Sequence, residues 1–260
     1  VLEAMTNYSG NKLFYEKGVD LYYNNTDFHN RVNLNLDDRS EFNKAKTVAE
    51  KADVVVMVLG EEGYQSGEGR SRTNIKLPGL QLELLKEVYE INKNIVLVVN
   101  SGRPLDLSWE DENIPTIVQA WQLGSRSGEA IAKVLYGDYN PSGKLTMSFP
   151  RNVGQVPIYY NFKNTGRPST SIQQVTNSGY ADVENSALYP FGHGLSYTKF
   201  SYTDVTLDKT ELTLKSKITL SFKIKNIGTV KGTEITQMYI RDVVGSCLLY
   251  TSPSPRDTNE

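Results

Sequence analysis

Carboxylate and guanidinium side chains are concentrated in one glycine-rich stretch, residues 61–72 (EEGYQSGEGRSR). Within it, Glu68 stands between Gly67 and Gly69, and glycine gives the backbone the freedom to turn sharply. Carboxyl groups are proton donors and acceptors. A flexible loop that lowers one of them into a neighbouring cleft is where we place the chemistry of this chain.

The loop follows a run of six apolar residues, 54–59, which is rich in β-branched side chains and too short to cross a bilayer. Such a run predicts a strand that is buried on both faces, as in parallel sheets. Gly60 ends the run, and Pro78 and Gly79 precede the next helix. Ligands of open α/β sheets bind beyond the carboxyl ends of the strands, and the loop begins at such an end.

Further elements are predicted by periodicity. Apolar residues at helical spacing predict helices over residues 41–52, 80–91 and 124–137. Continuous apolar runs predict strands over residues 94–100 and 115–121, with a turn-rich segment at 109–114 between them, and short strands are expected around 13–15 and 19–23. This order predicts an α/β fold, a three-layer α/β sandwich with a mostly parallel sheet.

Residues 102–104 follow the second buried strand, so we expect them on the same rim as Glu68, as a tight turn with Arg103 as a candidate brace of the loop. Residues 138–143 (DYNPSG) have the composition of a turn. Trp121 ends the third strand, where it either packs in the core or lines the rim. We expect His193 to be structural.

The periodicity changes to two beyond about residue 200. Ile218, Leu220, Phe222 and Ile224 alternate with polar residues, and residues 234–240 (EITQMYI) predict a further strand. This pattern predicts an antiparallel β-sandwich that is incomplete, because such sandwiches need about seven strands. The final segment does not continue the alternation, and we expect residues 245–260 to be a non-native tail.

Composition excludes several classes of function. A net charge of -2 and a pI near 5.9 give no electrostatic reason to expect nucleic acid or an acidic membrane surface as a partner. One cysteine, Cys247, excludes an internal disulfide, and the two histidines, His29 and His193, offer little to a metal. Neither GxGxxG after a strand nor GxxxxGK[ST] occurs, so a nucleotide-binding domain lacks support. We expect no metal and no cofactor.

Six stretches in order over residues 50–200 resemble the second half of glycoside hydrolase family three, the β-glucosidase and β-xylosidase family, and most of all its periplasmic bacterial β-glucosidase branch. They read ADVVVMVLGE, SGEGRSRTNIKLPGLQLELLK, VNSGRPLDL, GDYNPSGKLTMSFPRNVGQVPIYYN, NTGRP and LYPFGHGLSYT. The resemblance continues to about Val244.

The resemblance implies an enzyme of three parts: a β/α barrel, an α/β sandwich domain and a fibronectin type III-like domain. This chain would hold the sandwich domain (residues 1–180), a connector (181–200) and a truncated fibronectin type III-like domain (201–244). The N-terminal barrel would lie outside it and would supply the aspartate nucleophile and most of the sugar pocket. No substrate-binding residue can therefore be assigned here.

The resemblance also implies an exo-acting retaining β-glycosidase, periplasmic or extracellular, that acts on an oligosaccharide or β-glucoside. SGEGRSR matches the loop that carries the general acid/base, with Glu68 at that position. Glu61 is the next candidate, with anchoring of the loop as its other role, and Glu62 is expected at the surface. Arg70 and Arg72 fit structural ion pairs as well as sugar contacts. The rival function is a non-catalytic carbohydrate-binding or scaffold module, in which Glu68 would be solvated surface.

Overall fold

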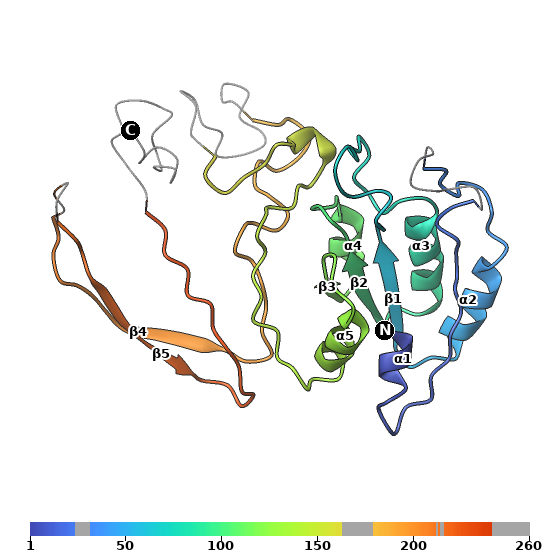
Figure 1. The fold of residues 1–260 in the computed structure, drawn as a ribbon, viewed down its shortest axis with the longest axis horizontal. Coiled ribbons are helices and arrows are strands. Elements are labelled where there is room, and N and C mark those ends of the chain that lie inside the picture. Colours follow the sequence, from blue (N-terminus) through green and yellow to red (C-terminus); the bar gives the residue numbers. More distant parts are fainter. Residues whose placement is uncertain (24–31, 163–178, 212, 214–215, 241–260) are drawn as a thin grey trace.

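A computed structural model of the protein describes residues 1–23, 32–162, 179–211, 213 and 216–240 (Figure 1). In chain order its elements are α1 (Leu2–Met5), α2 (Phe42–Glu50), β1 (Val55–Gly60), α3 (Gln81–Ile91), β2 (Ile95–Asn100), α4 (Ser108–Asn113), β3 (Thr116–Gln119), α5 (Ser127–Leu135), a 3-10 turn at Val153–Gln155, β4 (Phe200–Leu207) and β5 (Leu220–Asn226).

The strands β1, β2 and β3 form a parallel sheet in that order. The register pairs Val55 with Ile95 and Gly60 with Asn100, while Val96 pairs with Thr116 in β3. β2 is the central strand, and its residues are the most deeply buried because neighbours flank it on both sides. All three strands end at the same edge of the sheet, where the candidate loop begins (Figure 1).

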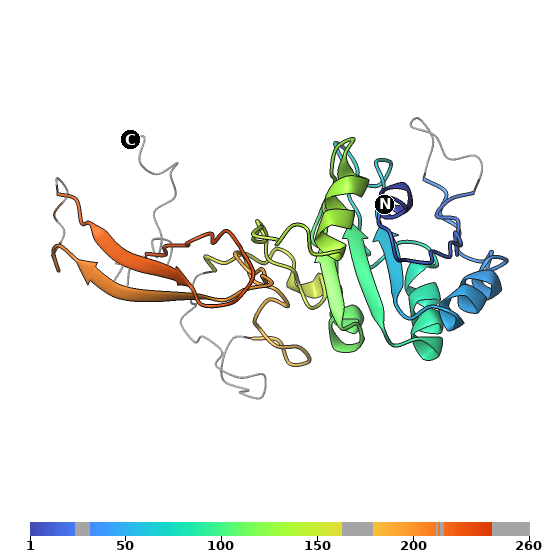
Figure 2. The same ribbon diagram turned by 90° about the horizontal axis from the view of Figure 1, so that it is seen from below.

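Helices cover both faces of this sheet. α2 and α3 lie on one face, and α1 and α5 lie on the other (Figure 2). On the first face Leu97 and Val99 pack with Leu85 of α3, whereas on the second face Val98 packs with Ile131 of α5. The predicted α/β class with a parallel sheet is confirmed. The three predicted helices and the strands predicted at 54–59, 94–100 and 115–121 form within a few residues of their expected bounds.

β1 departs from the expectation for residues 54–59. It has a partner on one side only within the described residues, and Val54 and Val58 are 49% and 40% exposed. The expectation that this run is buried on both faces is therefore wrong at the outer edge of β1. The strands expected at 13–15 and 19–23 are also not formed; Tyr22 makes an isolated bridge with Leu34.

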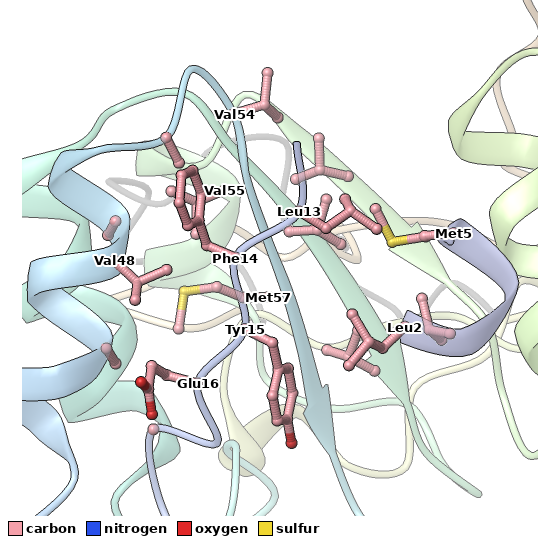
Figure 3. A pocket seen from close by; sticks show the side chains of 18 of the residues that line it. Leu2, Met5, Leu13, Phe14, Tyr15, Glu16, Val48, Val54, Val55 and Met57 are labelled. Atoms are coloured by element: carbon pink, nitrogen blue, oxygen red, sulfur yellow. The ribbon is translucent and has the colours of Figure 1, made fainter. Parts of the chain in front are cut away.

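A groove of about 750 Å³ lies along this part of the molecule, between β1, α1, α2 and the extended segment that follows α1 (Figure 3). On that segment Phe14 lies beside Val55 and Met57, whereas Leu13 lies toward Met5 of α1. The groove is lined mainly by apolar side chains.

α4 occupies the segment that the sequence had predicted to be turn-rich. Leu107, Glu110 and Ile114 are buried and fall at helical spacing. This spacing indicates a helix, but the many acidic residues of the segment made it look like a turn. Trp109 of this helix lies edge-on to Tyr89 of α3, with ring centroids 5.7 Å apart. Ile91, expected on the inward stripe of α3, is 42% exposed at the last position of the helix.

β4 and β5 pair antiparallel, with Phe200 opposite Asn226 and Leu207 opposite Leu220. The predicted alternation is visible but weakly buried: Ile224 is 43% exposed, because no second sheet covers this ribbon among the described residues. Residues 234–240 are described and form no strand, so that expectation is wrong. His29, Cys247 and the expected non-native tail at 245–260 lie outside the described residues.

Candidate active site

The loops that follow the three parallel strands meet at one rim. Glu61 follows β1, the turn at residues 102–104 follows β2, and Trp121 follows β3. The backbone N–H of Gly102 donates to Oε2 of Glu61 at 3.4 Å, and Nε2 of Gln122 donates to the Glu61 carbonyl at 3.3 Å. The expectation that the turn after β2 shares a rim with the candidate loop is confirmed.

Glu61 is the centre of this rim. Its side chain is 0% exposed, and Nη1 of Arg72 lies 2.5 Å from its Oε1. Nε of Arg103 lies 3.0 Å from the same oxygen and donates to Oε2 at 3.3 Å. A buried carboxylate persists only when it is paired and hydrogen-bonded. Between its two predicted roles, Glu61 therefore anchors the loop, and Arg72 is its structural ion-pair partner.

The remaining donors of both arginines go to the backbone of the loop. Nη2 of Arg103 donates to the carbonyl oxygens of Gln65, at 2.5 Å, and Arg70, at 2.7 Å. Nη2 of Arg72 donates to the carbonyl of Lys76 at 3.1 Å. Arg103 thus acts as the brace that the sequence suggested, because a single guanidinium nitrogen holds two points of the loop together.

Glu68 lies between those two points, at the tip of a turn. The N–H of Arg70 donates to the carbonyl of Gly67 at 3.2 Å, and Gly69 has φ 69°. A turn with positive φ at its third position favours glycine there, which explains the Gly–Glu–Gly sequence. Glu68 is exposed, and in the described part of the chain its side chain has neither an ion pair nor a hydrogen bond. Its carboxyl group is free to meet a ligand.

The end of β1 is closed by a side chain. Oε1 of Gln81 accepts the N–H of Gly60 at 2.7 Å, and its Nε2 donates to the Gly60 carbonyl at 2.8 Å. Gln81 is 5% exposed and lies in the first turn of α3. The pair of bonds imitates a neighbouring strand, and it fixes the point from which the loop departs.

The turn after β2 is packed tightly against the loop. A Cβ atom at Gly102 would lie 1.7 Å from Oγ of Ser66, so a larger residue there would force Ser66 to move. Oγ of Ser101 donates to the Arg103 carbonyl at 2.8 Å and accepts from Nε2 of Gln119 at 2.9 Å. These contacts hold the backbone of Arg103 in place while its side chain braces the loop.

The structure confirms the expectation for Trp121 and corrects the one for Glu62. Trp121 packs on Phe149, with ring centroids 5.8 Å apart, which confirms the core-packing interpretation. Glu62 was expected at the surface but is half-buried, and its Oε1 is buried without a hydrogen-bond partner among the described residues. Burial, and next the charge of Glu62, raise the pKa of the Tyr22 hydroxyl. Glu62 therefore lies beside Tyr22 in a half-buried position and not at the open surface.

Two other sequence candidates have structural contacts. Asn140, in the predicted turn 138–143, accepts hydrogen bonds from Oγ of Ser196 at 2.9 Å and from the N–H of Tyr197 at 2.8 Å. His193 stacks on Tyr189 with ring centroids 5.3 Å apart, and burial lowers its pKa. The N–H of Leu145 also donates to the carbonyl of His193 at 2.8 Å, so residues 193–197 are held against residues 140–145.

The candidate site lies at the rim and not in the mainly apolar groove of Figure 3, where Glu16 is the labelled carboxylate. A smaller hollow of about 230 Å³ adjoins the rim, against Gly60, Glu61, Glu62 and Gln81. Within the described residues no group of three or more histidine, cysteine, aspartate or glutamate side chains is placed to hold a metal ion. No helix in the same part of the chain is long and apolar enough to cross a membrane.

Sequence reasoning missed Gln81, Ser101, Gln119 and Gln122. One signal for Gln81 was present: it precedes Leu84, Leu85 and Val88 at helical spacing, so a polar residue occupies a position on a buried stripe. Such a residue needs hydrogen-bond partners, and here they are the backbone groups at the end of β1.

The arrangement presents one free carboxyl group on a braced turn. Hydrolysis of a glycosidic bond with retention needs two carboxyl groups roughly 5–5.5 Å apart. Glu68 is exposed on this rim, where a neighbouring surface could approach its carboxyl group.

Comparison with known proteins agrees with this arrangement. The family described as "Glycosyl hydrolase family 3 C-terminal domain" matches residues 1–197. A periplasmic beta-glucosidase of Salmonella typhimurium is 43% identical over 245 residues, which cover 91% of this chain and 32% of that protein. A beta-xylosidase of Formosa agariphila is 38% identical, over 90% of this chain and 32% of its own length. The chain thus spans about a third of these curated relatives.

Solved structures give the same result. A beta-glucosidase from Listeria innocua in complex with gluconolactone superposes with a TM-score of 0.71 at 36% identity, over 76% of this chain and 28% of that one. A b-glucosidase from Erythrobacter marinus superposes with a TM-score of 0.73 at 32% identity, over 87% of this chain and 31% of that one. The parallel sheet, its helices and the loop at the ends of its strands are therefore those of a C-terminal domain of glycosyl hydrolase family 3, the family to which this chain belongs.

Proposed function

We propose that the chain is part of an exo-acting retaining β-glycosidase, most like a β-glucosidase, that removes terminal non-reducing β-linked sugars. Glu68 is its general acid/base. The observation that carries this proposal is the turn itself. It exposes the carboxyl group of Glu68, unpaired among the described residues, while Arg72, Arg103 and Glu61 beside it hold the loop. Membership of the family and the names of the relatives support the same activity.

In this mechanism the protonated Glu68 gives its proton to the glycosidic oxygen as the bond to the anomeric carbon breaks. A carboxylate nucleophile on the opposite face forms a covalent glycosyl–enzyme bond. Glu68, now a carboxylate, then removes a proton from the water that attacks this intermediate, and the sugar leaves with its configuration retained. Both steps require only a carboxyl group that can reach the reacting oxygen.

The nucleophile comes from another domain of the whole enzyme, an N-terminal β/α barrel, and this proposal accords with the chain covering about a third of its relatives. Residues 1–180 form the α/β domain, 181–200 the connector and 201–244 part of a fibronectin type III-like domain. The start of β4 at Phe200 agrees with the second boundary. The name of the Salmonella relative supports a periplasmic or extracellular location.

The test is leaving-group dependence in the full-length enzyme. Glu68→Gln keeps the shape of the side chain but cannot supply a proton, so kcat/KM should fall at least a hundredfold for a phenyl β-glucoside, within the usual range of general acid catalysis of about 10²–10⁴. For a dinitrophenyl β-glucoside, which needs no proton, it should change little. Glu90→Gln, an exposed glutamate on α3, is the matched control. Equal loss on both substrates would exclude the acid role.

The rival interpretation, a carbohydrate-binding or scaffold module without catalysis, makes a different prediction. Such a module would bind sugars on its own, in calorimetry of this chain with cellobiose, and Glu68→Gln would leave every rate of the full-length protein unchanged.

A further inference from the structure

The contacts of Arg103 extend beyond loop anchoring, because they enclose the acid/base turn. Gln65 and Arg70, whose carbonyl oxygens Nη2 of Arg103 binds, lie three residues before and two residues after Glu68. The side chain therefore bridges the two ends of the turn, which we call its base. The Gly–Glu–Gly segment forms the tip of the turn, beyond this bridge.

One backbone hydrogen bond, from the N–H of Arg70 to the Gly67 carbonyl, crosses this tip. A Cβ atom placed at Gly67 or at Gly69 would meet no atom within 4 Å, so no other segment of the described chain packs against these two glycines. Both have positive φ, 137° and 69°, and glycine loses more conformational freedom than any other residue when such a geometry is fixed. The position of Glu68 consequently depends on the base of the turn rather than on its tip.

Glu61 orients the guanidinium group of Arg103. The carboxylate binds Nε of Arg103, which leaves Nη2 directed at the loop, and it is itself fully buried and held by Arg72. The backbone of Arg103 is fixed independently, by the hydrogen bond from Ser101. A fork of guanidinium donors is needed for this double role, and a lysine ammonium group cannot reproduce its geometry.

We propose that Arg103, oriented by Glu61, is the positioning residue that holds Glu68 in the geometry required for proton transfer. The inference rests on the proposed function, since it assigns Glu68 the role of acid/base. It adds that the competence of this group is determined by a side chain at the end of β2 that touches neither the sugar nor the reacting atoms.

The first arm of the test measures the loop and requires no catalysis. In this chain, Arg103→Lys should raise amide hydrogen exchange across residues 65–70 about tenfold or more, because charge-assisted hydrogen bonds to two carbonyls are lost. Trypsin cleavage after Arg70 should accelerate in parallel. Glu61→Gln, which retains the shape of the side chain, should give the same change with a smaller amplitude. Arg126→Lys, at an exposed arginine paired with Glu129 on α5, is the matched control.

The second arm uses the full-length enzyme. Arg103→Lys should lower kcat/KM for the phenyl β-glucoside at least about tenfold and for the dinitrophenyl β-glucoside less than about threefold, because only the first substrate needs the proton. A merely structural effect would lower both values equally, and that result would overturn the proposal. Unchanged exchange at residues 65–70 in a folded Arg103→Lys protein would also overturn it. Failure of the proposed function itself can be told apart. In that case Glu68→Gln would not show the expected difference between the phenyl and dinitrophenyl β-glucosides, while the faster hydrogen exchange in Arg103→Lys would still be observed.

Discussion

Val58 and Val98 are register partners in the parallel sheet, yet Val58 is 40% exposed and Val98 is fully buried. The difference comes from the sheet order: β2 has a neighbour on each side, whereas β1 has its single neighbour on one side among the described residues. Two identical side chains in equivalent strand positions therefore lie in different environments.

Lysine substitutions at Val58 and Val98 should differ in their effect on stability, because one residue lies in the edge strand and the other in the central strand. We expect Val58→Lys to change the free energy of unfolding by less than about 1 kcal/mol and to reduce aggregation, because charge on an edge strand opposes pairing with other chains. Val98→Lys should abolish cooperative unfolding, because the ammonium group would be buried without a partner. Urea unfolding and light scattering of both variants check this. Equal losses at both positions would mean that the outer edge of β1 is covered in solution.

Gln81 should contribute to stability through Gly60. In Gln81→Leu the N–H and carbonyl of Gly60 lose both of their bonds to this side chain, and we expect a cost of about 3 kcal/mol, since each buried unsatisfied group costs about 1–3 kcal/mol. The measurement is urea unfolding of this chain. Glu90→Leu, at an exposed position of the same helix, is the control and should change stability by less than about 0.5 kcal/mol. A cost for Gln81→Leu no larger than that of the control would contradict the assigned role.

Glu110 is a buried carboxyl group away from the rim. It is 1% exposed, and its Oε1 has no hydrogen-bond partner among the described residues. Burial, and next the charge of Asp106, raise its pKa to about 7, while Lys76 and Lys86 act in the opposite direction. The folded chain therefore retains this proton at pH values where the unfolded chain has already released it.

This difference gives stability a defined pH dependence. The contribution of Glu110 should be fully present below pH about 4.5 and should be lost as pH rises to about 7, by up to about 3 kcal/mol, since one pKa unit corresponds to about 1.4 kcal/mol. Unfolding free energies of the chain from pH 4.5 to 8 test it. Glu110→Gln should remove this loss, while Glu112→Gln, exposed on the same helix, should retain it. Parallel curves for all three proteins would contradict the assignment.

The sequence predicted the elements of the α/β domain because their signals are local. Apolar runs and helical stripes indicated β1, β2, β3, α2, α3 and α5, and the polar loop after β1 indicated where the rim would be. Sheet order is not local, so the run that ends at Leu59 was expected to be as buried as the run that ends at Val99.

The candidate site was predicted unevenly for the same reason. Glycines on both sides of Glu68 marked the turn, and the position of Arg103 after a neighbouring strand indicated a brace. The choice between Glu61 as acid and Glu61 as anchor required knowing that two guanidinium groups converge on it. The partner of Gln81 lies 21 positions away, and no periodicity in the sequence identifies such a contact.

Anion rescue tests the central claim, that Glu68 is the acid/base, most directly. In the full-length Glu68→Ala enzyme a dinitrophenyl β-glucoside should still form the glycosyl–enzyme bond, but its hydrolysis should be slow because no base activates water. Azide needs no base, so adding it should raise turnover and give β-glucosyl azide with retained configuration. Failure of azide to raise turnover in a folded variant, or hydrolysis as fast as that of the unsubstituted enzyme, would contradict the account.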